Sequence, residues 1–465
     1  MRYVSTRGTA APLSFDDALL AGLASDGGLY VPESWPRLET DRLRGLPYTA
    51  LAEAVLRPFV GDGTTAAALP RLLAQAYAGF SHPAVAPLRE IDDGLWLMEL
   101  FHGPTLAFKD VALQLLGRMF DAVLTARGER VTIIGATSGD TGSAAIEACR
   151  DRKAIDIFIL HPHGRTSEVQ RRQMTTVDAP NVHNIAVEGS FDDCQDLVKA
   201  MFADDRFRTE LRLSAVNSIN WARVAAQIVY YVRAGVALGS AGRPVSFAVP
   251  TGNFGNVLAA YAAAQMGLPV GRLIVGSNAN DILTRFLATG RMEIAEVCPT
   301  LSPSMDIQVS SNFERLMFDA LDRNGAEVAA MMRSFRSTGA FVMPDAAFDR
   351  IRGLFVGARF DDDETLAEMR SLYRRTGILI DPHSAVGLAA ARAWRGRTDG
   401  PIIVAGTAHP AKFPDAVERA TGVRPALPAH LADLYDRPER LAVLPNDLAA
   451  VQQHVRAALA MAGAA

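Results

Sequence analysis

The chain has 465 residues and a formal net charge of −4, with 47 Lys and Arg against 51 Asp and Glu. This balance gives no electrostatic reason to expect a nucleic-acid or anionic-membrane partner. No stretch approaches the roughly 20 charge-free apolar residues of a membrane span, and the first eight residues lack the apolar region of a secretion signal. We expect a cytoplasmic protein folded into two or three packed lobes.

The three cysteines, Cys149, Cys194 and Cys298, are dispersed and lack metal-ligand spacing. They indicate a reducing compartment and no metal site. Each is expected to be a small buried hydrophobic residue.

Residues 1–90 are predicted to form a separate N-terminal helical domain. Ser14 precedes an acidic first turn and an apolar run, which is typical of a helix N-cap. Gly27 and Gly28 predict a turn that leads into an extended segment ending at Pro32.

From about Leu95 onward, short β-branched runs alternate with amphipathic stretches of helical length. Apolar strands separated by helices predict βαβ units and a largely parallel sheet, hence an α/β core over residues 91–425. Ligands of such sheets bind at the carboxyl ends of the strands. The predicted strands are 131–134, 155–160, 182–187, 245–249, 273–276 and 402–405, and the predicted helices are 110–125, 142–149, 192–202, 221–236, 257–266 and 384–394.

The acidic run Asp361–Glu364 could be taken for a metal cluster. However, it opens a periodic segment that ends at Arg374, Arg375 and Gly377, and this polarity favours a capped helix. Residues 426–465 are predicted to form a C-terminal helical extension, with a closing helix over 446–461.

A first glycine-rich loop, Gly135–Gly142, directly follows a predicted strand. Glycines allow close approach of a ligand, and the N–H groups of the next helix favour an anion. Ser138 and Thr141 add hydroxyl donors, so a carboxylate or phosphate is the expected guest. The alternative is a tight strand–helix turn with capping hydroxyls.

A second loop, Pro250–Asn256, follows the strand at 245–249. Successive backbone amides in a glycine-containing turn form an anion-binding nest. The loop has neither the lysine of a P-loop nor a dinucleotide fingerprint, so a monophosphate fits best. An ordinary turn is the alternative.

Lys109 follows the apolar residues Leu106–Phe108 at the start of a predicted helix. Apolar surroundings and a positive helix end disfavour its charged form, which favours a nucleophilic or imine-forming lysine. An exposed lysine in the first turn of the helix is the alternative, and the segment alone does not exclude it. In a fourth segment, Ala405–Lys412, Thr407 offers a hydroxyl at a strand end and Lys412 offers a charge. A polar loop is the alternative there.

Together these segments resemble the bacterial and fungal branch of the threonine synthase family. The resemblance extends from about residue 3 to residue 420, in family order and spacing. The matching stretches are 3–8, 26–32, 102–110, 136–142, 217–223, 252–256, 300–307 and 406–413.

The resemblance implies a tryptophan-synthase β-like fold, fold type II of the pyridoxal-phosphate enzymes, with two lobes of mostly parallel sheet. It also implies a lyase that converts O-phospho-L-homoserine and water to L-threonine and phosphate, the last step of threonine biosynthesis. Lys109 would carry pyridoxal 5'-phosphate as a Schiff base and act as the base at Cα, and Thr407 would bond the pyridine nitrogen. The cofactor phosphate is assigned to Gly252, Asn253, Phe254, Gly255 and Asn256, and the substrate carboxylate to Ser138, Gly139, Asp140 and Thr141.

Several assignments stay open. Related enzymes commonly have asparagine where Asp140 stands, so the partner of Asp140 is not assigned. Arg223 and Lys412, and more weakly Arg165, are candidates for the substrate phosphate, with ordinary surface or helix charges as the alternative. A β-eliminating dehydratase, a phospholyase paralogue or a non-catalytic cofactor-binding chain are the rival functions. The chain could be a monomer or a homodimer.

Overall fold

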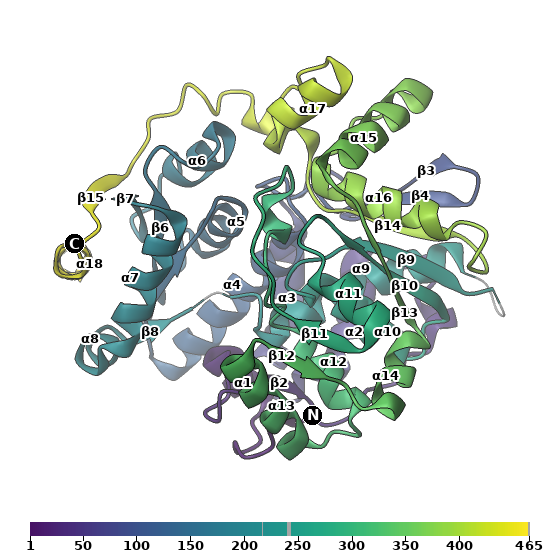
Figure 1. The fold of residues 1–465 in the computed structure, drawn as a ribbon. Coiled ribbons are helices and arrows are strands. Elements are labelled where there is room, and N and C mark those ends of the chain that lie inside the picture. Colours follow the sequence, from purple (N-terminus) through teal and green to yellow (C-terminus); the bar gives the residue numbers. More distant parts are fainter. Residues whose placement is uncertain (216, 240–242, 464–465) are drawn as a thin grey trace. The chain divides into compact units, whose positions relative to one another are not determined.

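The structure is a computed structural model that describes residues 1–215, 217–239 and 243–463 (Figure 1). The chain divides into two compact units, each of which is described by itself. Unit 1 comprises Met1–Leu73, Phe80–Phe108 and Ser218–Ala426, and unit 2 comprises Ala74–Gly79, Lys109–Asn217 and Leu427–Ala465. None of the described helices has the length and apolar character required to cross a bilayer.

Unit 1 is built around a six-stranded sheet in the order β13-β10-β9-β14-β4-β3. Its strands are parallel except for β3, which runs antiparallel to β4. The predicted parallel sheet is therefore confirmed, although β3, β4 and the edge strand β13 were not predicted. The strands are β3 Leu88–Asp92, β4 Leu95–Glu99, β9 Val245–Pro250, β10 Val270–Ser277, β13 Phe355–Arg359 and β14 Ile402–Gly406.

Alternate residues of this sheet face opposite layers of helices, as the two-residue period of a strand requires. Ala248 belongs to a core with α15 (Asp362–Thr376) and α16 (Pro382–Trp394). The neighbouring Phe247 contacts Tyr231 of α9 (Trp221–Leu238), with ring centroids 4.9 Å apart.

The N-terminal residues of unit 1 pack on α9. Helix α2 (Tyr48–Val60) contacts α9, and the rings of Tyr3 and Phe59 both contact Trp221. Residues 1–73 therefore share a compact unit with residues 80–108 and 218–426, whereas the sequence divided the chain at residue 90. The remaining elements are β1 Tyr3–Ser5, α1 Phe15–Ala21, β2 Tyr30–Pro32, η1 Thr40–Leu43, α3 Thr64–Tyr77 (its last residues counted in unit 2), α10 Gly255–Gln265, α11 Ile282–Thr289, β11 Arg291–Glu293, η2 Pro303–Met305, α12 Phe313–Ala320, α13 Gly325–Thr338, β12 Ala340–Val342, α14 Asp345–Arg352, η3 Pro410–Lys412 and α17 Pro414–Thr421.

Unit 2 contains a fully parallel sheet in the order β15-β7-β6-β5-β8. Ile134 joins a core with α7 and α18, whereas the adjacent Ile133 faces α4 and α5. The elements are α4 Lys109–Arg127, β5 Val131–Ala136, α5 Asp140–Cys149, β6 Ile155–Pro162, α6 Glu168–Thr175, β7 Val182–Glu188, α7 Phe191–Ala203, α8 Asp205–Leu211, β8 Leu213–Ser214, η4 Ala429–Leu431, β15 Ala442–Pro445 and α18 Leu448–Gly463.

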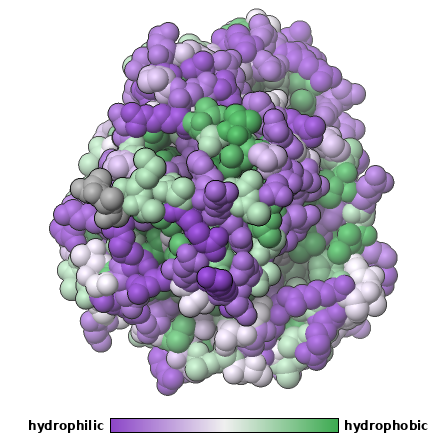
Figure 2. All heavy atoms as spheres, turned by 90° about the vertical axis from the view of Figure 1, so that its left-hand side faces the viewer, coloured by the Kyte–Doolittle hydropathy of each residue, from purple (hydrophilic) through white to green (hydrophobic). Residues whose placement is uncertain are grey.

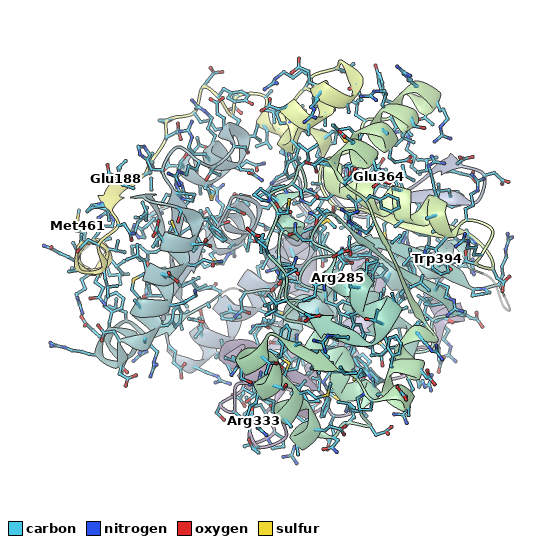
Figure 3. All side chains as sticks on the ribbon, in the orientation of Figure 1. Glu188, Arg285, Arg333, Glu364, Trp394 and Met461 are labelled. Carbon is cyan, nitrogen blue, oxygen red and sulfur yellow. The ribbon has the colours of Figure 1, made fainter. Side chains whose placement is uncertain are left out.

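Three predicted helix ends are confirmed. Ser14 accepts a hydrogen bond from the Asp17 N–H as the N-cap of α1. Asp361 forms a capping box with Glu364 at the start of α15, and Gly377 ends that helix in the left-handed conformation. Figure 3 labels Glu364, in the first turn of α15, and Trp394, the last residue of α16. The acidic run is thus used for capping, and the described residues contain no group of His, Cys, Asp and Glu that could hold a metal.

The prediction that all three cysteines are buried is wrong for Cys298, which is exposed. Burial raises the pKa of Cys149 to about 12 and that of Cys194 to about 11. We therefore expect one thiol to react with a disulfide reagent in the folded protein and three after unfolding, since the thiolate is the reactive form. Titration of the native protein and of Cys298→Ser checks this, and the variant should show no fast-reacting thiol.

The N-terminal turn of unit 1 is organised around Asp26. Its carboxylate accepts hydrogen bonds from the Ser5 hydroxyl at 2.7 Å and from the N–H groups of Thr9, Ala10 and Gly28 at 2.9–3.0 Å. Burial raises the pKa of Asp26, but these hydrogen bonds outweigh it and lower the pKa to about 2.

A carboxyl whose folded-state pKa is depressed stabilises the fold above its unfolded pKa and loses that effect as the pH falls through its folded pKa. Asp26→Asn should lower the free energy of unfolding at pH 7 by about 1 kcal/mol, given the partial exposure of the group. Urea denaturation between pH 7 and pH 2.5 tests this. The difference between wild type and variant should shrink below about pH 4; a constant difference would show that the carboxylate charge is irrelevant.

Figure 2 shows one face of the molecule, on which hydrophilic residues predominate and hydrophobic ones lie in small separate groups.

Candidate active site

Strands β4 and β14 are parallel neighbours in the sheet of unit 1. The segment that precedes Lys109 follows β4, and the segment that carries Thr407 follows β14, so the two segments meet at adjacent strand ends. The Phe108 N–H donates to the Thr407 carbonyl at 2.8 Å, and the His409 N–H donates to the Leu106 carbonyl at 3.0 Å. The Lys412 Nζ donates to the Thr105 carbonyl at 2.8 Å. The main chain immediately before Lys109 is therefore fixed against the segment that carries Thr407.

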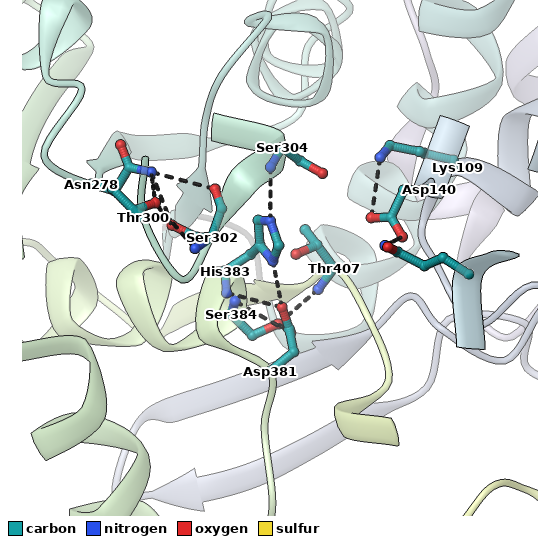
Figure 4. Close-up of polar contacts among 11 residues, drawn as sticks. Lys109, Asp140, Asn278, Thr300, Ser302, Ser304, Asp381, His383, Ser384 and Thr407 are labelled. Carbon is teal, nitrogen blue, oxygen red and sulfur yellow. Dashed lines mark hydrogen bonds and ion pairs between the residues drawn. The ribbon is translucent and has the colours of Figure 1, made fainter. Parts of the chain in front are cut away.

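Thr407 itself is held by a buried polar network (Figure 4). Its N–H donates to Ser384 Oγ at 2.9 Å, and the Ser384 hydroxyl donates to Asp381. Asp381 also pairs with His383 Nδ1 at 2.9 Å, and His383 Nε2 accepts from the Ser304 N–H at 3.2 Å. The Thr407 Oγ1 atom is buried and has no hydrogen-bond partner among the described residues. The network therefore fixes the main chain of Thr407, and its hydroxyl can form a hydrogen bond with a ligand.

The loop at residues 250–256 leads into α10 as the sequence predicts. Phe254, at the N-cap, has a φ of 63°, which is uncommon for a residue other than glycine and is held by packing on Phe313 and Phe355. The N–H groups of Gly252, Asn253, Phe254 and Gly255 donate no hydrogen bond to any described residue. Unpaired N–H groups at the start of a helix suit an anion, so the anion nest stays a prediction with which this geometry is compatible.

Asn256 lies one residue into α10, and its side chain turns toward α9. Its Oδ1 accepts hydrogen bonds from the hydroxyls of Tyr230 and Tyr231, and its buried Nδ2 has no partner among the described residues. Arg223, also on α9, is 4% exposed, and its Nη1 likewise has no partner within the described chain. Burial lowers the pKa of Arg223 to about 10, so at neutral pH it is a buried guanidinium with donor capacity left for an anion.

The other candidate cations differ in burial. Lys412 is fully buried in unit 1, whereas Arg165 is exposed in unit 2, between β6 and α6. Of the three, Arg223 and Lys412 are therefore preorganised by packing and Arg165 is not.

Unit 2 brings Lys109 and Asp140 together (Figure 4). Lys109 begins α4 and is 7% exposed, and its Nζ lies 3.3 Å from Asp140 Oδ2. Asp140 Oδ1 accepts from Gln170 Nε2 at 2.8 Å. The open question about Asp140 is thus resolved in part: its carboxylate contacts the lysine amine and an amide. A carboxylate this close favours an ammonium at Lys109 and opposes the effects of burial and the helix end.

The loop around Asp140 is closed by Thr137, whose Oγ1 accepts from the N–H groups of Gly139 at 3.0 Å and Gly142 at 2.9 Å. Gly139 has a φ of 146°, and a Cβ there would lie 2.5 Å from Gln170 Oε1. The hydroxyls of Ser138 and Thr141 have no partner among the described residues. They leave donors beside the N-terminus of α5, as a carboxylate site requires.

Sequence reasoning missed Asp381, His383, Ser384, Gln170 and Thr137 as members of these networks. A signal was available for the first three, since an aspartate followed by a proline is typical of a helix start. Gln170 gives no such signal, because it is an ordinary helix residue of α6.

The residues present fit pyridoxal phosphate. Unit 1 supplies N–H groups suited to a phosphate and, in Thr407, a hydroxyl suited to a ring nitrogen, and none of these has a hydrogen-bond partner within the part of the chain that the structure describes. Unit 2 supplies a buried lysine amine, the group needed for covalent attachment to an aldehyde. A hydroxyl beside the ring nitrogen does not enforce a charged pyridinium, unlike a carboxylate.

Comparison with known proteins agrees with this geometry. Family models described as Threonine synthase N terminus, Pyridoxal-phosphate dependent enzyme and Threonine synthase, C-terminal match residues 2–77, 81–348 and 384–455. The threonine synthase of Pseudomonas aeruginosa is 57% identical over 98% of both chains. The structure of a PLP-bound threonine synthase from Brucella melitensis matches with a TM-score of 0.96 at 53% identity, over 98% of this chain and 99% of that one. The yeast threonine synthase structure matches with a TM-score of 0.94 at 36% identity, over 99% of both chains. The chain belongs to the threonine synthase family, whose members are pyridoxal-phosphate-dependent enzymes with an α/β fold of type II.

Proposed function

We propose that this member of the threonine synthase family converts O-phospho-L-homoserine and water to L-threonine and phosphate, with Lys109 as its cofactor lysine and catalytic base. The observation that carries the proposal is the Lys109 amine, buried and 3.3 Å from Asp140 in a chain of established family. When bound, pyridoxal phosphate supplies an electron sink for negative charge at the substrate Cα.

In unit 2, Lys109 takes a proton from the substrate Cα and returns one at the end of the reaction. Asp140 accepts a hydrogen bond from the amine and orients it, and Gln170 in turn fixes the carboxylate. Ser138, Gly139 and Thr141 hold the substrate carboxylate with hydroxyl and N–H donors at the start of α5. These contacts keep Cα within reach of the lysine.

In unit 1, the N–H groups of residues 252–256 bind the cofactor phosphate and the Thr407 hydroxyl bonds the pyridine nitrogen. Both assignments are supported by donors that are unpaired in the described structure. Asp381 and Ser384 act through the Thr407 main chain and hold its hydroxyl in position.

The phosphate leaving from the substrate Cγ needs cationic partners. We assign Arg223 and Lys412 to this role and rank Arg165 below them, since the first two are buried and the third is exposed. The Nη1 of Arg223, which no described residue binds, supports the inclusion of Arg223 in this assignment.

The reaction is tested by incubating the purified enzyme with O-phospho-L-homoserine or with serine, and assaying threonine, phosphate and keto acid. Equal amounts of threonine and phosphate from the first substrate, and little keto acid from either, are expected. Keto acid from serine at a comparable rate would instead indicate a dehydratase. Phosphate release without threonine would indicate a phospholyase.

A further inference from the structure

The segment at residues 300–312 of unit 1 follows β11. It contacts the turn at residues 252–256, to which the cofactor phosphate is assigned above. The Ser310 hydroxyl donates to the Gly252 carbonyl at 2.7 Å. The Asn253 carbonyl accepts two hydrogen bonds from Asn312, one from Nδ2 at 3.0 Å and one from the main-chain N–H at 3.2 Å. Two consecutive carbonyls of the turn are therefore held from one side.

These contacts fix the direction of two N–H groups. In a planar trans peptide the C=O and the following N–H point in opposite directions. When Ser310 holds the Gly252 carbonyl, the Asn253 N–H must point away from Ser310, and the same argument applies to Asn312 and the Phe254 N–H. Both N–H groups donate no hydrogen bond to any described residue, so they remain available on the opposite side of the turn.

The amide of Asn312 cannot rotate without losing other partners. Its Oδ1 accepts from Arg315 Nη1, and its Nδ2 also donates to the Ser218 carbonyl at 3.0 Å. Arg315 is itself buried and donates to the main-chain carbonyls of Tyr30 at 3.0 Å and Ile219. The donor face of Asn312 is thus turned toward Asn253 by the packed core.

The same segment leaves no room for a side chain at Gly252. A Cβ there would lie 2.8 Å from the Ser304 carbonyl oxygen and 3.3 Å from Met305 Cα. Asp306 stabilises this part of the segment by accepting from Asn278 Nδ2 at 2.8 Å and from the Thr300 N–H at 2.9 Å. The close approach explains the glycine at position 252.

We propose that Ser310 and Asn312 are positioning residues, which aim the N–H groups of Asn253 and Phe254 at the cofactor phosphate by anchoring the two preceding carbonyls. The inference rests on the proposed assignment of residues 252–256 to that phosphate. It gives residues 300–312 a specific role in phosphate recognition rather than a general role in packing.

The test compares pyridoxal phosphate with pyridoxal, which has the same ring and aldehyde but no phosphate. Each is titrated into the apoenzyme of wild type, Ser310→Ala and Ser310→Thr, and binding is followed by absorbance. Ser310→Ala should weaken pyridoxal phosphate binding about five- to tenfold, as expected for loss of a hydrogen bond that orients a charge-binding donor, and leave pyridoxal binding unchanged. Ser310→Thr retains the hydroxyl and should restore most of the affinity. Asn312→Ala should show the same selectivity with a larger effect.

Ser337→Ala is the matched control, because the exposed Ser337 hydroxyl also donates to a main-chain carbonyl, that of Ser334 at 3.1 Å. It should leave both affinities unchanged. Equal weakening of both ligands in Ser310→Ala, or no weakening of either, would overturn the positioning role. Gly252→Ala distinguishes failure of the phosphate assignment from failure of the positioning role. If this variant does not selectively weaken the binding of pyridoxal phosphate, the assignment of residues 252–256 to the phosphate fails. If it does while Ser310→Ala has no effect, only the present inference fails.

Discussion

Replacing Lys109 by alanine is expected to lower threonine formation by at least about a thousandfold, because both covalent attachment and proton transfer at Cα are assigned to its amine. The absorbance band that an active lysine gives with the cofactor, at about 410–420 nm and removable by borohydride, should also disappear. Lys109→Arg should be equally inactive, because a guanidinium retains the charge beside Asp140 but is neither a nucleophile nor a base. Steady-state assays of phosphate release and absorbance spectra measure both effects.

The control is Lys199→Ala, which removes a lysine that is 71% exposed and paired with Asp196 in the same unit. It should leave turnover and spectrum unchanged. Full turnover in Lys109→Ala would exclude the catalytic role, and an intact borohydride-sensitive band would place the covalent linkage on another lysine.

Replacing Asp140 by asparagine should lower kcat by about a hundredfold, the scale of a misplaced acid–base group, with a smaller change in KM. The amide preserves the shape of the side chain but removes the charge 3.3 Å from Lys109 Nζ and one of the two acceptor oxygens. Because a nearby carboxylate favours an ammonium, the variant should also move the acidic limb of the kcat profile to lower pH. Phosphate-release assays across the pH range measure kcat, KM and this displacement.

Asp196→Asn is the matched control, since it removes the carboxylate of an exposed Asp–Lys pair from the same unit. Asp140→Asn with an unchanged kcat and pH profile would mean that the contact with Lys109 is incidental. A loss of kcat without a pH displacement would assign Asp140 to loop structure instead. Thermal unfolding of both variants distinguishes that case from a folding defect.

The sequence predicted much of the fold, because its signals are local. The apolar runs at 131–134 and 245–249 form strands, and the polarity of residues 361–377 is realised as a capped helix. It did not predict β4, because five residues with neither a helical nor a strictly alternating pattern are ambiguous until a neighbouring strand pairs with them.

The amino-acid sequence by itself determined the family, and it singled out Lys109 and the two glycine-rich loops as candidate site residues, since each of these depends on residue types at short fixed spacings. Only the tertiary structure decided that Asp140 contacts Lys109, that Asp381 contacts Ser384, which binds the Thr407 N–H, and that Ser310 and Asn312 bind the carbonyls of Gly252 and Asn253. These partners are 23 to 59 residues apart, apart from the local Asp381–Ser384 bond. A hydrogen bond requires a specific distance and direction between two atoms, and across such separations these are set by how the strands and helices pack.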